Sequence, residues 1–142
     1  PEPGIVLSAA AEADRSRPLA GMHVLLVADA PDDRELERTV LENAGASVTA
    51  VDSPAARVAY RRRRPDVVVS DVAADEESGH ELIEALRLET SADSRVLAVA
   101  LTASSGQVER RRVRAAGFQR HVAKPLVPDE LVQAIVALTA VR

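Results

Sequence analysis

The sequence lacks cysteine and tryptophan, and it contains one phenylalanine and one tyrosine. Without cysteine the chain can form neither a disulfide framework nor a thiolate metal site, which is compatible with a reducing cytoplasm. Because aromatic side chains are so few, a buried core has to be built mainly from alanine, valine and leucine. The 142 residues suit one domain that is large enough to bury such a core.

Other absences narrow the classes of partner. No apolar run approaches the roughly 20 residues of a membrane-spanning helix, and residues 1–13 carry no basic leader. The net charge of −4 disfavours a general affinity for nucleic acid. We therefore expect neither a nucleic-acid partner nor direct membrane contact, and we expect a cytoplasmic location.

The first 20 residues are rich in alanine, proline and charge and show no sustained period. Such a segment is typical of a linker or of the end of a preceding domain. Because the sequence starts without methionine, we expect a piece of a longer protein or a processed chain. A single domain is expected over residues 21–142.

Five short apolar runs predict buried strands. They cover His23–Val27, Ser47–Val51 and residues 65–71, 95–101 and 118–123. The third run contains Val67-Val68-Val69 and ends in Asp71, and such a β-branched run is typical of a strand that is buried on both faces.

Helical patterns separate these runs. Pro31 is a favourable first helical residue, Asp32 and Asp33 suit the helix N-terminus, and Gly45 is a natural stop. The expected apolar faces of the first, third and fifth helices are Leu36, Val40, Leu41 and Ala44; Leu82, Ile83 and Leu86; and Leu131, Ile135 and Leu138.

The second and fourth helices are rich in arginine. Ser53-Pro54 opens the second, which ends in the run Arg61 to Arg64. The fourth, over residues 104–116, is weaker and carries Arg110, Arg111, Arg112 and Arg114. The latter cluster is either a partner-binding surface or a solvated face. Strand and helix thus alternate with short connections, which predicts a doubly wound parallel sheet with helices on both faces.

Polar residues fall at the carboxyl ends of four of these strands, where open α/β sheets place their chemistry. Asp29 follows the first strand, Asp71 ends the third, Thr102 follows the fourth and Lys124 the fifth. Two carboxylates at one edge suit Mg²⁺, and a hydroxyl and an ammonium beside them suit phosphoryl oxygens. Each residue alone has an ordinary structural explanation, but their coincidence at one edge favours a shared site.

The segments Val-Ala-Asp-Ala-Pro-Asp, Pro-Asp-Val-Val-Val-Ser-Asp, Ala-Leu-Thr-Ala and Ala-Lys-Pro, in this order, resemble a response regulator receiver domain. The resemblance covers residues 21–141. It implies a flavodoxin-like (βα)5 fold with strand order 2-1-3-4-5. It also implies a phosphorelay function, in which Asp71 accepts a phosphoryl group from a histidine kinase or a histidine phosphotransfer domain.

The resemblance assigns further roles. Mg²⁺ would be held by Asp29, Asp71 and the backbone carbonyl of Ala73. Thr102 would turn its hydroxyl onto the phosphoryl group, and Lys124 would pair with another phosphoryl oxygen. The family usually holds the Lys-Pro bond cis, so a cis Lys124–Pro125 bond is expected.

His121 occupies the position of the family's aromatic switch residue. It could rotate together with Thr102, or it could be a fixed strand residue. Ala73 and Ser104 stand where other members carry side chains that orient the hydrolytic water, so slow self-dephosphorylation is the only enzymatic activity expected of this domain itself.

Other departures from the family pattern support a second hypothesis. Ala28 replaces the first of two adjacent acids, and Ala74-Asp75 replaces the usual Met-Pro. The loss of an acid that acts through metal-bound water would weaken Mg²⁺ binding by roughly 10–100-fold. The alternative is therefore a pseudo-receiver, an interaction module that is not phosphorylated.

An aspartyl phosphohydrolase on the same fold is disfavoured, because no second acid stands two residues after Asp71. The absence of a glycine-rich phosphate loop likewise disfavours a nucleotide-binding flavodoxin relative. The Ala/Pro-rich leader resembles the linker before the C-terminal receiver of a hybrid histidine kinase, so we expect that setting rather than a stand-alone regulator. A weak homodimer through the fourth and fifth helices is a further expectation.

Overall fold

The computed structural model describes residues 17–72, 77–88, 96–102, 111, 113–115 and 117–140. In these segments five parallel strands form one sheet in the order β2-β1-β3-β4-β5. The strands are β1 (His23–Val27), β2 (Ser47–Val51), β3 (Val67–Val72), β4 (Ala98–Thr102) and β5 (Arg120–Ala123). The flavodoxin-like fold class and the strand order are thereby confirmed.

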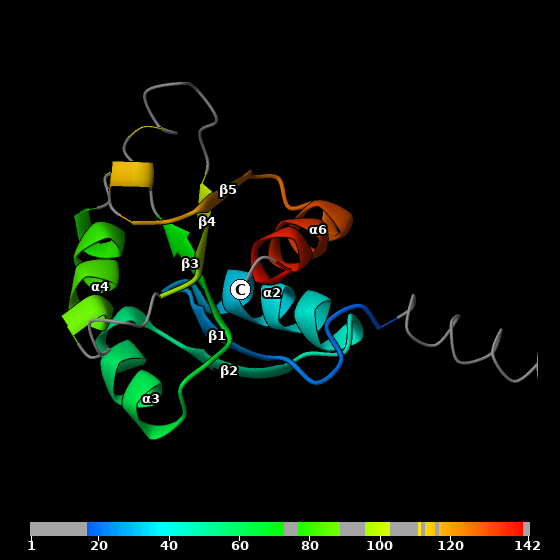
Figure 1. Ribbon diagram of the computed structural model, residues 1–142, viewed down its shortest axis with the longest axis horizontal. Helices are drawn as coiled ribbons and strands as arrows, with labels where there is room; N and C mark the ends of the chain where they lie inside the picture. The colour runs from blue at the N-terminus through cyan, green and yellow to red at the C-terminus, as the bar shows by residue number, and fades with distance from the viewer. Residues whose placement is uncertain are drawn as a thin grey trace, which may run out of the picture.

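The helices cover both faces of this sheet. They are α2 (Pro31–Asn43), α3 (Ala56–Arg62), α4 (Glu77–Leu88) and α6 (Pro128–Thr139), and a 3-10 turn, η1 (Ser53–Ala55), precedes α3. Helices α2 and α6 lie on one face, and α3 and α4 lie on the other (Figure 1). Most of the helix expected over residues 104–116 falls outside the described residues. Within the described segments, no helix combines the length and apolarity needed to cross a membrane.

The strand period of two divides the core into two clusters. Val24 and Leu26 of β1 point to the face under α2 and α6, whereas Leu25 and Val27 point to the face under α3 and α4. β3 follows the same rule. All its valines up to Val69 are no more than 1% exposed, as expected for a strand covered on both faces.

Two strands start later than the sequence indicates. β4 begins at Ala98 rather than at residue 95, and β5 begins at Arg120 rather than at residue 118. The Gln119 side chain accepts a hydrogen bond from Ala98 N (2.7 Å) and donates one to the Val96 carbonyl (2.9 Å). A side chain therefore satisfies backbone groups at the first residue of β4 and just before it, where a strand ladder was expected.

Residues 17–20, the described part of the segment before residue 21, take part in the packing. Leu19 is fully buried in the cluster under α2 and α6, and its backbone N–H donates to the Ala44 carbonyl at 2.8 Å. Gly45 has φ +104° and packs against this segment, so that a Cβ there would lie 3.0 Å from Ala20 N. The turn after α2 thus needs glycine, both for its backbone conformation and for this contact.

Helix α2 faces the core with most of the expected side, but Glu37 is buried in place of Leu36. Leu36, which the apolar pattern assigned to the core, is 54% exposed, whereas Glu37 is 2% exposed. Leu41 and Ala44 are buried as expected and lie one and two turns beyond Glu37. A carboxyl group therefore occupies a core-facing position of this helix.

The orientation of α2 predicts unequal effects of two similar substitutions. Leu41→Ala should lower the free energy of unfolding by about 2–5 kcal/mol, because it leaves a cavity in the core. Leu36→Ala should change it by less than about 0.5 kcal/mol, because that side chain is exposed. Urea unfolding of both variants measures the difference. Equal losses would contradict this orientation.

Candidate functional site

Asp71 lies at the carboxyl end of β3, in the middle of the sheet. It stands opposite Leu101 of β4 in the parallel register, and its side chain is 9% exposed. The valine run that precedes it is buried on both faces, so the strand carries the carboxylate to the rim of the core and fixes it there.

Lys124 brings a cation to this carboxylate. Its Nζ lies 2.7 Å from Asp71 Oδ2, and its backbone N–H donates to the Thr102 carbonyl at 2.7 Å. The contact is an ion pair, since among the described residues Oδ2 has no partner with hydrogen-bond geometry. The Lys124–Pro125 bond is cis, as expected. Burial alone would lower the pKa of Lys124, but its contact with Asp71 and the charges of Asp33 and Glu37 offset this and raise it.

Glu37 is a buried acid near Asp71. Burial is the main reason why the pKa of Glu37 is raised to about 9. Hydrogen bonding to Asp71, the negative charge of Asp71 and that of Asp33 add to the rise, whereas the positive charge of Lys124 opposes it. Its Oε1 atom has no hydrogen-bond partner in the described part of the chain. The two carboxyl groups of Glu37 and Asp71 thus lie together in a nearly water-free place beside one ammonium group.

Asp33 completes the group from the same helix. Its Oδ2 lies 3.5 Å from Lys124 Nζ, and it stands one turn before Glu37 on the same helical face. The sequence pattern predicts for Asp33 only a place at the helix N-terminus, and Glu37 is not among the predicted site residues. The available signal was a glutamate placed four residues before Leu41, inside an otherwise apolar stripe.

Asp29 is turned toward the start of η1. Its Oδ1 accepts from the Ser53 backbone N–H at 2.8 Å, and its Oδ2 accepts from the Ser53 hydroxyl at 3.0 Å. Within the described segments no hydrogen bond or ion pair joins Asp29 to Asp71 or to Lys124. The neighbouring Ala28 is 1% exposed and offers only a methyl group to the site.

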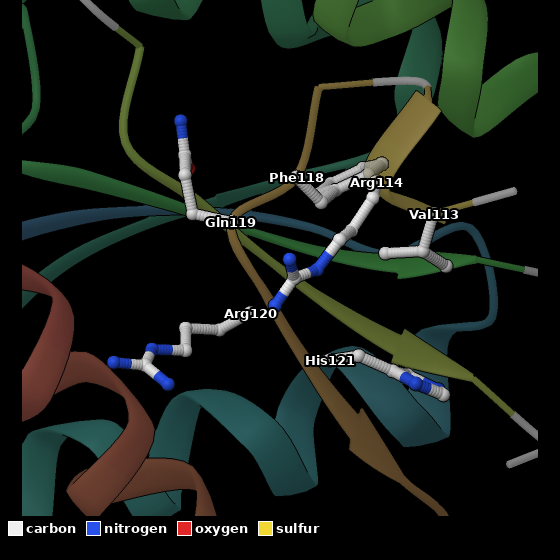
Figure 2. A pocket seen from close by; sticks show the side chains of 6 residues that line it. All are labelled: Val113, Arg114, Phe118, Gln119, Arg120 and His121. Carbon is white, nitrogen blue, oxygen red and sulfur yellow. The ribbon is translucent and has the colours of Figure 1, made fainter. Parts of the chain in front are cut away.

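Thr102 and His121 are in contact. The Thr102 hydroxyl is in hydrogen-bonding contact with His121 Nε2, and Thr102 is 2% exposed. His121 also lines a cavity of about 220 Å³ together with five other side chains, which are Val113, Arg114, Phe118, Gln119 and Arg120 (Figure 2). His121 therefore connects the buried threonine to a hollow on the α4 side of β5.

The oxygen atoms at this edge of the sheet are of the kind that binds a magnesium ion. Asp29 and Asp71 supply carboxylate oxygens, which Mg²⁺ prefers, and each Asp29 oxygen accepts one hydrogen bond and keeps a lone pair. Among the described residues, no group of three or more potential ligands stands ready for a metal. Ala73, the third expected ligand, and Ser104 lie outside the described residues, as do residues 74–76.

The buried Glu37 predicts that stability falls as pH rises. The native chain keeps the Glu37 proton up to about pH 9, whereas the unfolded chain releases it near the ordinary value of 4.5. Between these values the native state binds more protons, so the free energy of unfolding decreases with pH. The charged side chains that act on the Glu37 carboxyl group are those of Asp71, Asp33 and Lys124. Thermal unfolding should show that the free energy of unfolding falls between about pH 5 and about pH 9. The decrease should be larger by roughly 1–3 kcal/mol in wild type than in Glu37→Gln. Equal losses would contradict the assignment.

Comparison with known proteins agrees with this architecture. A family model described as the response regulator receiver domain matches residues 24–136. An uncharacterized 14.6 kDa protein of Leptolyngbya boryana is 39% identical over 118 residues, which cover 82% of this chain and 89% of that protein. Virulence sensor protein BvgS of Bordetella pertussis is 34% identical over 131 residues, covering 89% of this chain but 11% of BvgS.

A solved structure gives the same fold. The receiver domain of sensor histidine kinase PA1611 from Pseudomonas aeruginosa, which has a magnesium ion coordinated in its active site cleft, aligns with a TM-score of 0.70 and 26% identity. The alignment covers 85% of this chain and 99% of that domain.

Proposed function

This chain belongs to the response regulator receiver domain family of two-component signalling, and from that membership we propose that it accepts a phosphoryl group on Asp71 with the help of Mg²⁺. The observation that carries the proposal is the 2.7 Å contact between Lys124 Nζ and Asp71 Oδ2 at the end of the central strand. This contact brings together a nucleophilic carboxylate and a cation that can bind the incoming phosphoryl group, and the two come from distant segments of the chain.

In the proposed reaction an Asp71 carboxylate oxygen attacks the phosphorus of a phosphohistidine. The P–N bond breaks, the imidazole leaves and takes up a proton, and an acyl phosphate forms on Asp71. Lys124 would then turn its Nζ from the carboxylate to a phosphoryl oxygen. Asp29, Asp71 and the Ala73 carbonyl would hold Mg²⁺, which when bound neutralises the charge on the transferring phosphoryl group.

Thr102 and His121 are the proposed switch. To reach a phosphoryl oxygen, the Thr102 hydroxyl would have to exchange its contact with His121 for the new acceptor. His121 would then be released to change its position beside the cavity it lines. Such a pair can favour one of two surface arrangements, and that change is the signal.

The acyl phosphate is proposed to be long-lived. Ala73 and Ser104 offer no carboxylate or amide side chain to orient a hydrolytic water. A phosphoryl half-life of seconds in the presence of Mg²⁺ would count against this part of the proposal.

The proposed phosphodonor is a histidine kinase or a histidine phosphotransfer domain in the cytoplasm. The chain covers about a tenth of BvgS, to which it is similar. The likeness to a receiver domain of a sensor histidine kinase supports a setting inside a hybrid kinase. A weak homodimer through the fourth and fifth helices remains part of the proposal.

A second candidate is a pseudo-receiver that takes no phosphate. It is favoured by Ala28, and by the side chain of Asp29, both oxygens of which accept hydrogen bonds from Ser53. In this alternative the Lys124–Asp71 ion pair is a permanent structural element of the domain.

Beryllofluoride, which mimics a bound phosphoryl group, separates the two candidates. Titration of beryllofluoride with Mg²⁺ should shift the amide resonances of Thr102 and Lys124 in wild type but not in Asp71→Asn. NMR is the suitable readout, because the chain contains no tryptophan for fluorescence. No response of wild type at millimolar Mg²⁺ would overturn the phosphoacceptor proposal in favour of the pseudo-receiver.

A further inference from the structure

The strand-end position that carries the family's first acid cannot bind a cation in this chain. Ala28 stands there, 1% exposed, with its backbone N–H bound to the Val51 carbonyl at 2.9 Å. The adjacent Asp29 is exposed and directed at Ser53. Of the strand-end acids, Asp71 alone is in contact with Lys124 in the described residues.

Helix α2 brings two acids to the same place from another direction. Asp33 Oδ2 lies 3.5 Å from Lys124 Nζ, and Glu37, one turn further, is buried near Asp71. Three carboxyl groups, those of Asp33, Glu37 and Asp71, thus surround one ammonium group. The charged carboxylates of Asp33 and Asp71 outnumber the single ammonium group of Lys124, which leaves room for a further cation at this point.

Glu37 is the unusual member of this group. It is 2% exposed, and in the described part of the chain its Oε1 atom has no hydrogen-bond partner. An unpartnered buried carboxyl group destabilises a fold, and an apolar side chain of similar size would fit the buried stripe of α2 better. A buried, unpartnered acid at this position, close to Asp71, therefore indicates a ligand that the acid serves.

We propose that Glu37, assisted by Asp33, supplies the acidic group that position 28 lacks and strengthens the binding of Mg²⁺ beside Asp71. The inference rests on the proposed function, since it concerns the same metal. In this arrangement the acid that supports the ion comes from the helix after β1 instead of from the end of β1. Loss of the strand-end acid and gain of the helical acid compensate each other within one site.

The test measures Mg²⁺ affinity by calorimetry and by amide shifts, without any phosphodonor. Glu37→Gln should weaken Mg²⁺ binding by about 10–100-fold, the usual cost of losing a supporting acid. The double variant Glu37→Gln/Ala28→Asp should recover most of the loss, because it returns an acid to the strand end. Glu42→Gln is the matched control, because Glu42 is exposed on the same helix and pairs with Arg38. It should leave the affinity unchanged.

Thermal unfolding without Mg²⁺ gives the second readout. Glu37→Gln should melt at a higher temperature than wild type while binding Mg²⁺ more weakly, a combination that a purely structural acid would not give. Wild-type Mg²⁺ affinity in Glu37→Gln would overturn this inference alone, provided that wild type responds to Mg²⁺ and beryllofluoride. If wild type responds to neither and Ala28→Asp does, both the inference and the proposed phosphoacceptor function fail.

Discussion

Replacing Lys124 by methionine is expected to lower the free energy of unfolding by about 3 kcal/mol, near the low end for breaking a buried ion pair. The substitution keeps most of the side-chain volume but removes the ammonium that lies 2.7 Å from Asp71 Oδ2. The Asp71 carboxylate is then left without a cation beside it, in a place that is almost closed to water. Urea unfolding near neutral pH measures the loss.

A double-mutant cycle separates this effect from lost packing. In Lys124→Met/Asp71→Asn the carboxylate is gone as well, so most of the lost stability should return. A coupling energy of at least about 1 kcal/mol is expected, because the two side chains are in direct contact. If Lys124→Met proves as stable as wild type, or if the double variant recovers nothing, the ion pair does not hold this edge of the sheet together.

Asp71→Asn is expected to abolish phosphorylation of the chain by small phosphodonors such as phosphoramidate, and to leave the fold intact. Asparagine has nearly the shape of aspartate, but its amide is not a nucleophile for phosphorus at neutral pH. Phosphoryl incorporation followed by mass spectrometry should therefore fall to background, while the circular dichroism spectrum stays that of wild type.

The control for this variant is Asp129→Asn, which removes an exposed carboxylate from the first turn of α6. It should be phosphorylated at the wild-type rate. Phosphorylation of Asp71→Asn at a rate comparable with wild type would contradict the role given to Asp71.

The order and the direction of the elements could be predicted from the sequence. The alternation of strand and helix, and the continuous valine run before Asp71, are local signals that tertiary packing did not override. Helix α2 begins at Pro31 and α6 at Pro128, as expected for residues that cannot donate a backbone hydrogen bond.

What the sequence could not give depends on contacts between distant segments. The late start of β4 results from the Gln119 side chain, which hydrogen-bonds to the backbone of a segment about twenty residues earlier. The burial of Glu37 near Asp71 depends on how α2 packs on the sheet, which no helical periodicity encodes. A hydrophobic pattern ranks residues by type and therefore assigned Leu36 to the core instead.

The candidate site was predictable in its location but not in its geometry. Strand ends alone bring Asp71, Thr102 and Lys124 to one edge, and the β4–β5 register then places His121 close to Thr102. The orientation of Asp29 toward Ser53 could not be read from the sequence, because a carboxylate after a strand can turn either to the sheet edge or to the next helix start.

The location of a phosphoryl group on the wild-type chain tests the phosphoacceptor role most directly. The chain is incubated with phosphoramidate and Mg²⁺, and the modified residue is identified by peptide mass spectrometry. If Asp71 is the acceptor, a single phosphoryl group is found on Asp71, and none is found when a chelator has removed Mg²⁺. A chain that stays unmodified, or that carries the group on another residue, would contradict this role.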